Sequence, residues 1–282
     1  MTARTARTAR TQPTAPAQPT HPADQRVTQT RVVRSEWTKL RSLPSTAWSL
    51  LTAIVLIVGL GAGYSLLRVT RPPRQPADLS SFDPTAISLT GIHLAMLAIG
   101  VLGVLLITGE YATGSIRISF AAVPRRLPVL WGKAIAFALT TIALCVPATF
   151  AAFLVGQSIL SSEHLDTTLS HPGAARAVLG SALYLTAIGL LGLGLGALLR
   201  NTAGAISSLF GLLFAPQIIV GFLPSTWSDQ VYRYLPVPAG VAVTNVQPAP
   251  ESLAPWTGLG LLCLYTAVVL GLAAWQLRRR DA

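Results

Sequence analysis

The chain has 282 residues, of which 51% are hydrophobic and only 11% are charged, whereas about 25% of the residues of a soluble globular protein are charged. This composition, with a mean hydropathy of +0.56, excludes an ordinary water-soluble enzyme. The net charge of +11 would indicate a nucleic-acid-binding protein only if the basic residues shared one surface, so their positions must be established first.

Residues 1–30 are predicted to form a disordered cytoplasmic tail. They begin with a repeated Thr-Ala-Arg unit and continue with Pro, Gln and Thr, a composition that cannot bury a core. The first apolar stretch begins near residue 48, which is too far along the chain for a cleavable signal peptide.

Residues 31–43 have the periodicity of an amphipathic helix that lies in the membrane interface. Glu36 falls within the apolar arc, so it either pairs with an Arg or Lys side chain or contacts a partner. An ordinary juxtamembrane anchor is an equally good interpretation. The apolar face consists of Val33, Trp37 and Leu40, with Val32 and Leu43 at its edge.

Six uncharged runs of more than 20 residues follow this helix. Each contains enough apolar residues to cross a hydrocarbon core of about 30 Å as a helix. A β-barrel would instead show short alternating segments. The chain is therefore predicted to be an all-α integral membrane protein with six transmembrane helices. The expected spans are 48–67, 86–107, 134–157, 177–199, 203–223 and 256–276.

The basic residues are distributed unevenly between the two sides of the membrane. If both termini are cytoplasmic, 16 of the 21 Lys and Arg residues lie on the cytoplasmic side, which is the bias that orients membrane proteins. The net charge then favours anionic lipid and a cytoplasmic partner, and not nucleic acid. The Arg-rich, Ala-rich and Gly-rich composition indicates a bacterial protein, so the expected location is the cell membrane, as a multi-pass protein.

The link between the second and third spans, 109–133, is too long for a simple turn. Ile116, Phe120 and Val123 recur at the spacing of an apolar stripe on a short helix. Such a helix with basic residues on the cytoplasmic side is suited to contact a partner. The alternative is an interfacial hairpin that binds anionic lipid.

Several kinds of chemistry are missing from the sequence. Neither of the two lysines belongs to a P-loop, and no expected span contains an acidic or basic residue at depth. His93, the one histidine within a span, is expected to form a helix–helix hydrogen bond. Glu163, His164 and Asp166 lie together in an outer loop, where a solvated turn is favoured over a metal site. No catalytic residue, cofactor or metal is therefore expected in this chain.

Two further features of the spans and loops concern packing. Two glycine pairs at helical spacing, Gly59 with Gly63 and Gly192 with Gly196, predict close contacts between helices. Such contacts are compatible with helices that slide or dimerise and equally with static packing. The aromatic and proline-rich loop 224–255 is expected to form a short re-entrant or interfacial segment at the outer leaflet.

Three stretches of the chain resemble the membrane subunits of ABC transporters of the type-2, exporter-type permease family. They are RSEWTKLRS (34–42) before the first span, GEYATGSIR (109–117) after the second, and LLRNTAGAISSLFGLLF (198–214) between the fourth and fifth. With the six spans, the resemblance covers about residues 30–280, so a transmembrane domain is expected over 31–282.

This resemblance implies a permease subunit without an ATPase site of its own. A second permease subunit, identical or paralogous, would complete the pathway, and separate P-loop ATPase subunits would hold ATP and Mg. The cargo would be exported and would be hydrophobic or amphipathic, such as a drug, an antibiotic or a lipid-like compound.

The resemblance also assigns roles to particular residues. Residues 32–43 would form the interface helix, with Val33, Glu36, Trp37 and Leu40 at its contacts. Residues 109–126 would form the coupling loop that meets the ATPase. Its expected contact residues are Glu110, Tyr111, Gly114, Arg117 and Phe120.

Two other classes of function are compatible with parts of the sequence. A membrane scaffold or sensor subunit would need the six spans but not the coupling-loop motif, and a neighbouring gene for a P-loop ATPase would argue against it. An intramembrane enzyme rests only on His93 and scattered hydroxyl groups, and full activity after His93→Ala would exclude it.

Overall fold

The computed structural model of the protein describes residues 28–42, 44–71, 82–116, 127–247 and 251–279. Within these ranges all regular secondary structure is helical, which confirms the predicted all-α class. The helices are α1 (Gln29–Ser42), α2 (Pro44–Thr70), α4 (Pro84–Ser88), α5 (Ile92–Thr113), α7 (Leu127–Leu160), η1 (Ser161–Glu163), α8 (Ala174–Leu199), α9 (Thr202–Gly221), α10 (Ser225–Tyr232), α11 (Pro236–Val241) and α12 (Pro255–Arg279).

Six of these helices, α2, α5, α7, α8, α9 and α12, are long and apolar enough to cross a membrane, as predicted. The second begins later than expected, at Ile92 rather than near residue 86. The reason is a separate short helix, α4, whose N-cap Asp83 accepts hydrogen bonds from two backbone N–H groups of its first turn. The predicted tail, 1–30, lies outside the described residues except for Thr28 and the first two residues of α1.

The second and third long helices extend beyond the expected spans at one end. α5 continues to Thr113, and α7 already begins at Leu127. Glu110 and Lys133 therefore lie within these helices and not in the link between them. The prediction that no expected span contains a charged residue at depth is not contradicted, since both residues lie beyond the expected bounds 86–107 and 134–157. The apolar runs alone underestimate the helix lengths.

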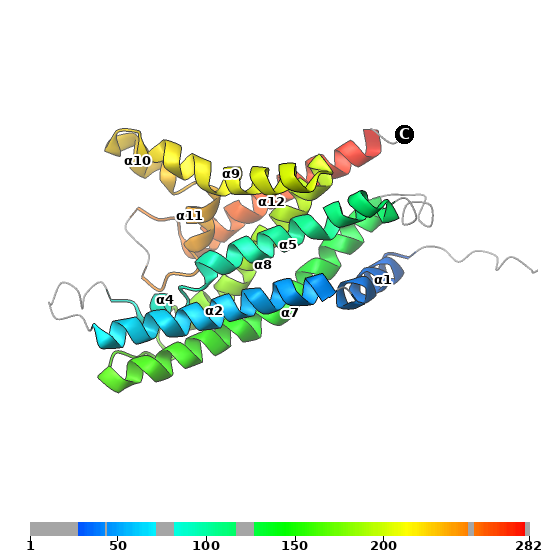
Figure 1. Ribbon diagram of the computed structural model, residues 1–282. Coiled ribbons are helices and arrows are strands. Elements are labelled where there is room, and N and C mark those ends of the chain that lie inside the picture. The colour runs from blue at the N-terminus through cyan, green and yellow to red at the C-terminus, as the bar shows by residue number, and fades with distance from the viewer. Residues whose placement is uncertain (1–27, 43, 72–81, 117–126, 248–250, 280–282) are drawn as a thin grey trace, which may run out of the picture.

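The long helices form three layers, with α8 at the centre (Figure 1). α8 is the most buried, with 78% of its most apolar window enclosed, and it packs against α5, α7 and α12. α2 lies along α7 on one side, and α9 and α12 lie on the other (Figure 1). The layers place the outermost helices α2 and α9 where a large part of their surface remains uncovered.

The described parts of the four links and termini that the basic residues assign to one side meet at one end of the bundle. There, α1, the C-terminal end of α12, the ends of α5 and α7 and the α8–α9 turn lie together, as Figure 1 shows. We call this the α1 end. The opposite end, formed by α4, η1, α10 and α11, is called the α10 end. The loop predicted to be re-entrant, 224–255, contains the two short helices of that end.

Glycines allow α5 and α8 to approach closely. A Cβ atom added at Gly103 would overlap the carbonyl oxygen of Gly189, and one at Gly192 would overlap that of Gly100. Gly196 also packs on α5, so these glycines of α8 lie at close helix contacts within the chain. The other predicted pair, Gly59 and Gly63 in α2, has open space where a Cβ would stand.

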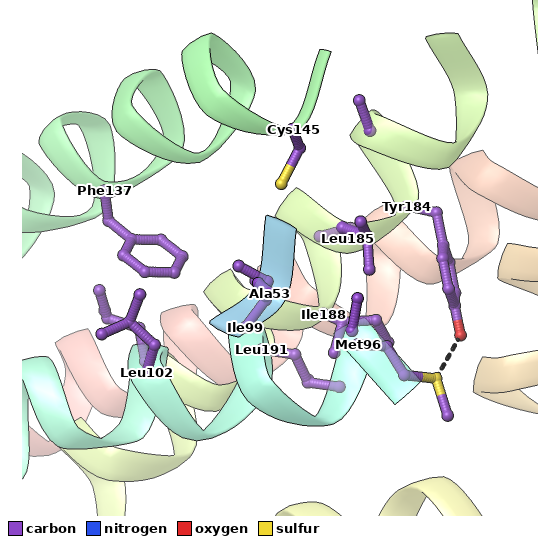
Figure 2. Packing of buried hydrophobic residues seen from close by; sticks show 14 of the residues in the cluster. Ala53, Met96, Ile99, Leu102, Phe137, Cys145, Tyr184, Leu185, Ile188 and Leu191 are labelled. Atoms are coloured by element: carbon purple, nitrogen blue, oxygen red, sulfur yellow. Dashed lines mark hydrogen bonds between the residues drawn. The ribbon is translucent and has the colours of Figure 1, made fainter. Parts of the chain in front are cut away.

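The core lies where α5, α7 and α8 meet. Phe137 of α7 lies beside Ile99 and Leu102 of α5, as Figure 2 shows. The Tyr184 hydroxyl is buried there and donates a hydrogen bond to the Met96 sulfur at 2.8 Å (Figure 2). This contact joins α8 to α5 and gives the buried hydroxyl a partner.

Candidate functional site

Four charged side chains from three helices form a cluster at the α1 end. Glu36 and Lys39 come from α1, Glu110 from α5 and Lys133 from α7. We call these four residues the charge cluster. Lys133 Nζ donates to Glu36 Oε2 at 2.6 Å and to Glu110 Oε1 at 2.8 Å. Lys39 Nζ donates to Glu36 Oε1 at 2.7 Å and, more weakly, to Glu110 Oε1 at 3.4 Å.

The cluster exists because α1 docks against the first two turns of α7. The Gln29 side chain donates to the carbonyl oxygen of Pro128 at 3.1 Å. Val32 packs directly over Gly132, where an added Cβ would lie 2.7 Å from the valine Cγ1. The small residue at 132 thus lets α1 come close enough for its next turn to present Glu36 to Lys133.

The two central charges are almost fully enclosed. Lys133 has 1% and Glu36 3% of its surface exposed. Burial alone would raise the pKa of Glu36, but the Lys133 and Lys39 ammonium groups outweigh it and hold the pKa below its ordinary value. Burial alone would lower the pKa of Lys39, but Glu36 and Glu110 hold it above its ordinary value. Glu36 and Lys39 are therefore both charged at neutral pH.

The pKa shifts predict a stability profile with two limbs. The lowered pKa of Glu36 contributes stability above pH 4.5, its ordinary value, and this is lost as pH falls through the folded pKa. The raised pKa of Lys39 contributes stability below pH 10.5 that is lost as pH rises through the folded pKa. Thermal unfolding in detergent should show the acid limb in the wild type and a shallower one in Glu36→Gln. If the wild type and Glu36→Gln lost stability equally below pH 4.5, the acid limb could not be assigned to Glu36.

The residues expected to contact an ATPase lie partly within this site. Glu110 belongs to the charge cluster, and the next residue, Tyr111, lies with its ring 5.3 Å below the Arg200 guanidinium. Gly114 ends α5 in the left-handed conformation, with φ +71°, which favours glycine at that position. Arg117 and Phe120 lie outside the described residues, so their positions stay predictions.

The interface helix presents a different face from the one predicted. Its buried side consists of Val32, Glu36 and Leu40, whereas Val33 and Trp37 are only half-buried. The buried side of α1 is therefore centred on Val32, which was predicted at the edge of the apolar face. The reason is that α1 packs on α7 through the side that carries the ion pair. Of the two alternatives for Glu36, pairing with a basic side chain is confirmed.

The chain was compared with known protein families. It matches the ABC-2 family transporter protein over residues 31–282. The chain belongs to this family. No curated protein matches it. The resemblance of the three stretches to type-2 permeases is therefore confirmed, and the chain is a membrane-spanning permease subunit.

Lys133 is the site residue that sequence reasoning missed. It was counted only as one of the basic residues of the permease's cytoplasmic side. A signal was available: the sequence has only two lysines, and Lys39 follows Glu36 at the i+3 spacing of a helical ion pair. The second lysine could not be joined to them, because it is 97 residues away from Glu36 along the chain.

The other candidate residues of the permease are not part of this site. The His93 side chain is exposed and makes no hydrogen bond within the described ranges, so the expected helix–helix bond is absent there. Glu163, His164 and Asp166 are exposed at the α10 end. Among the described residues, no three His, Cys, Asp or Glu side chains are grouped to hold a metal.

Proposed function

We propose that the permease is driven by a P-loop ATPase that docks at the α1 end, on α1 and the coupling loop 109–126. The observation that carries the proposal is the charge cluster. It joins the interface helix, the helix that enters the coupling loop and the helix that leaves it. A force applied to the loop would therefore reach three helices at once.

The α8–α9 turn is coupled to the same place. Arg200 lies over the ring of Tyr111, and Thr202 donates a hydrogen bond to Thr108 at 3.0 Å. A displacement of the end of α5 would therefore also move the start of α9. Because packed helices move as rigid bodies, small shifts at this end would become tilts of whole spans.

The cluster suits transmission of movement better than it suits stability alone. Replacing a buried ion pair by apolar residues of similar volume is often neutral or stabilising. Moreover, Glu110 Oε2 is buried and has no hydrogen-bond partner in the described part of the chain. An unsatisfied acceptor favours any movement of α5 that supplies it with a donor. We infer that the cluster has two arrangements and that ATPase closure selects between them.

The distribution of charge indicates the orientation of the bundle, and the exposed helices indicate where it contacts lipid or another subunit. The α1 end would face the cytoplasm of a bacterium, in agreement with the excess of basic residues there. Only 22% of the most apolar window of α9 is enclosed, so this helix would contact lipid or a second permease subunit, identical or paralogous. ATP and Mg would be held by the ATPase, and the cargo would be an exported hydrophobic or amphipathic compound.

Docking is tested by changing the coupling loop and measuring recovery of the ATPase with the detergent-solubilised permease. Arg117→Glu and Phe120→Asp should each lower the recovered ATPase by about tenfold, since loss of a charged or apolar contact costs roughly 1–3 kcal/mol. Glu110 also lies within the coupling loop, but its side chain is only 16% exposed and pairs with Lys133. Glu110→Gln should therefore retain docking but lower substrate-stimulated ATP hydrolysis.

The control is Arg68→Glu, which reverses an exposed arginine at the α10 end. It should leave both recovery and hydrolysis unchanged. Equal recovery with Arg117→Glu, Phe120→Asp and the control would show that the docking assignment is wrong. Intact docking with no substrate-stimulated hydrolysis under any condition would instead favour the scaffold or sensor function.

A further inference from the structure

A second site lies at the α10 end, away from the charge cluster. A cavity of about 640 Å³ opens there between the start of α5, the end of α9, α10, α11 and the segment before α12. This volume is within the range of small-molecule sites, roughly 300–1,000 Å³. Its polar lining includes His93, Gln217, Asp229, Arg233, Asn245 and Glu251.

The charges of this cavity do not neutralise one another. The side chains of Asp229, Arg233 and Glu251 form no ion pair within the described ranges, although both signs line the same space. The two carboxylates are exposed and can be hydrated. Arg233 differs, because its Nε atom is buried and has no hydrogen-bond partner in the described structure. Arg233 is the one arginine or lysine among the described residues that line the cavity.

Part of the lining is apolar. Val237, Pro238 and Val241 of α11 line the cavity together with the charged residues. The guanidinium of Arg233 lies 5.0 Å above the ring of Tyr234, which holds it in place without satisfying its Nε. The cavity thus combines charged side chains of both signs with apolar ones.

The walls are held by bonds that need no ligand. The Arg176 guanidinium donates to the carbonyl oxygen of Asn245 at 2.7 Å. The Tyr265 hydroxyl donates to the carbonyl oxygen of Tyr234 at 2.9 Å. These contacts fix the two ends of the segment that carries α11, so the site is formed in advance, which lowers the entropy cost of binding.

We propose that this cavity binds an amphiphile with a zwitterionic head. Arg233 meets the anionic oxygen of the ligand, Asp229 and Glu251 meet its cationic nitrogen, and α11 contacts its apolar body. A purely anionic ligand would face two carboxylates, and a purely cationic one would face the Arg233 guanidinium. As a substrate class for transport, this assignment rests on the proposed function, but binding itself does not require the ATPase.

The test is binding of hexanoylcarnitine, a short zwitterionic amphiphile, to the full chain in lipid nanodiscs. Hexanoate carries only its negative charge and hexanoylcholine only its positive charge. Calorimetric titration should give at least about tenfold tighter binding for hexanoylcarnitine than for either, because a charge-assisted contact is worth roughly 1.5–3 kcal/mol.

Variants separate the two charged contacts. Arg233→Gln should weaken hexanoylcarnitine and hexanoate by about tenfold and leave hexanoylcholine unchanged, which also shows that the variant is folded. Asp229→Asn combined with Glu251→Gln should weaken binding of hexanoylcholine and leave that of hexanoate unchanged. Arg68→Gln, at the same end but outside the cavity, is the matched control and should change nothing.

Equal affinity of all three probes for every variant would mean that they only partition into the lipid, and would overturn the site. Absence of binding by any probe would overturn it as well. Neither result affects recovery of the ATPase with the permease, so failure of this site and failure of the proposed docking are distinguishable.

Discussion

Replacing Lys133 by methionine is expected to lower the free energy of unfolding by about 3–5 kcal/mol, because it removes the buried cation that Glu36 and Glu110 share and leaves them only the partly exposed Lys39. Lys133 is the only residue of the charge cluster that contacts both Glu36 and Glu110 at less than 3 Å. Methionine keeps most of the side-chain volume, so the loss reports on charge and not on a cavity. Thermal or denaturant unfolding of the purified permease in detergent measures it.

The matched control is Lys39→Met in the same cluster. The Lys39 side chain is 42% exposed, so water replaces the lost ion pair and the cost should stay within about 1 kcal/mol. The triple variant Lys133→Met, Glu36→Gln and Glu110→Gln removes the unpaired charges and should recover much of the lost stability. It should nevertheless lack substrate-stimulated ATP hydrolysis. Equal destabilisation by Lys133→Met and Lys39→Met would show that the cluster does not hold α1.

The six spans could be predicted because their signal is local. An uncharged apolar run of sufficient length has one stable conformation in lipid, whatever it packs against. The positions of the helix ends were less certain, since α5 and α7 continue past their apolar runs to Glu110 and Lys133. Those residues are stabilised there by each other, which is a contact between helices that no local pattern contains.

The interface helix shows the same limit in another form. The periodicity of the sequence located α1 and identified the side with Val33 and Trp37 as apolar. It contains no information on the helix against which α1 packs. The side that is buried was decided by Lys133 of α7, which draws Glu36 inward. The cavity of the α10 end was not predicted either, because its walls come from four helices that only the tertiary structure brings together.

The glycines of α8 were identified in the sequence, but their role was left open. The structure assigns them to close packing on α5 and α12, so they are predicted to be sensitive to the smallest substitution. The same holds for Gly103 of α5, which faces the carbonyl oxygen of Gly189 in α8. Gly103→Ala should destabilise the permease by about 3 kcal/mol, at the upper end of overpacking effects, because the added methyl group would meet backbone and not a flexible side chain. Gly192→Ala meets the carbonyl oxygen of Gly100 and should behave alike.

The control for both is Gly211→Ala in α9, where a Cβ would meet nothing within 4 Å. Alanine is favoured over glycine within a helix by about 1 kcal/mol, so this variant should be unchanged or slightly more stable. Unfolding curves and the yield of monodisperse protein measure all three. If Gly103→Ala and Gly192→Ala matched the control, α5 and α8 would have to separate freely. In that case the close contact between them would not be what fixes α8 at the centre of the bundle.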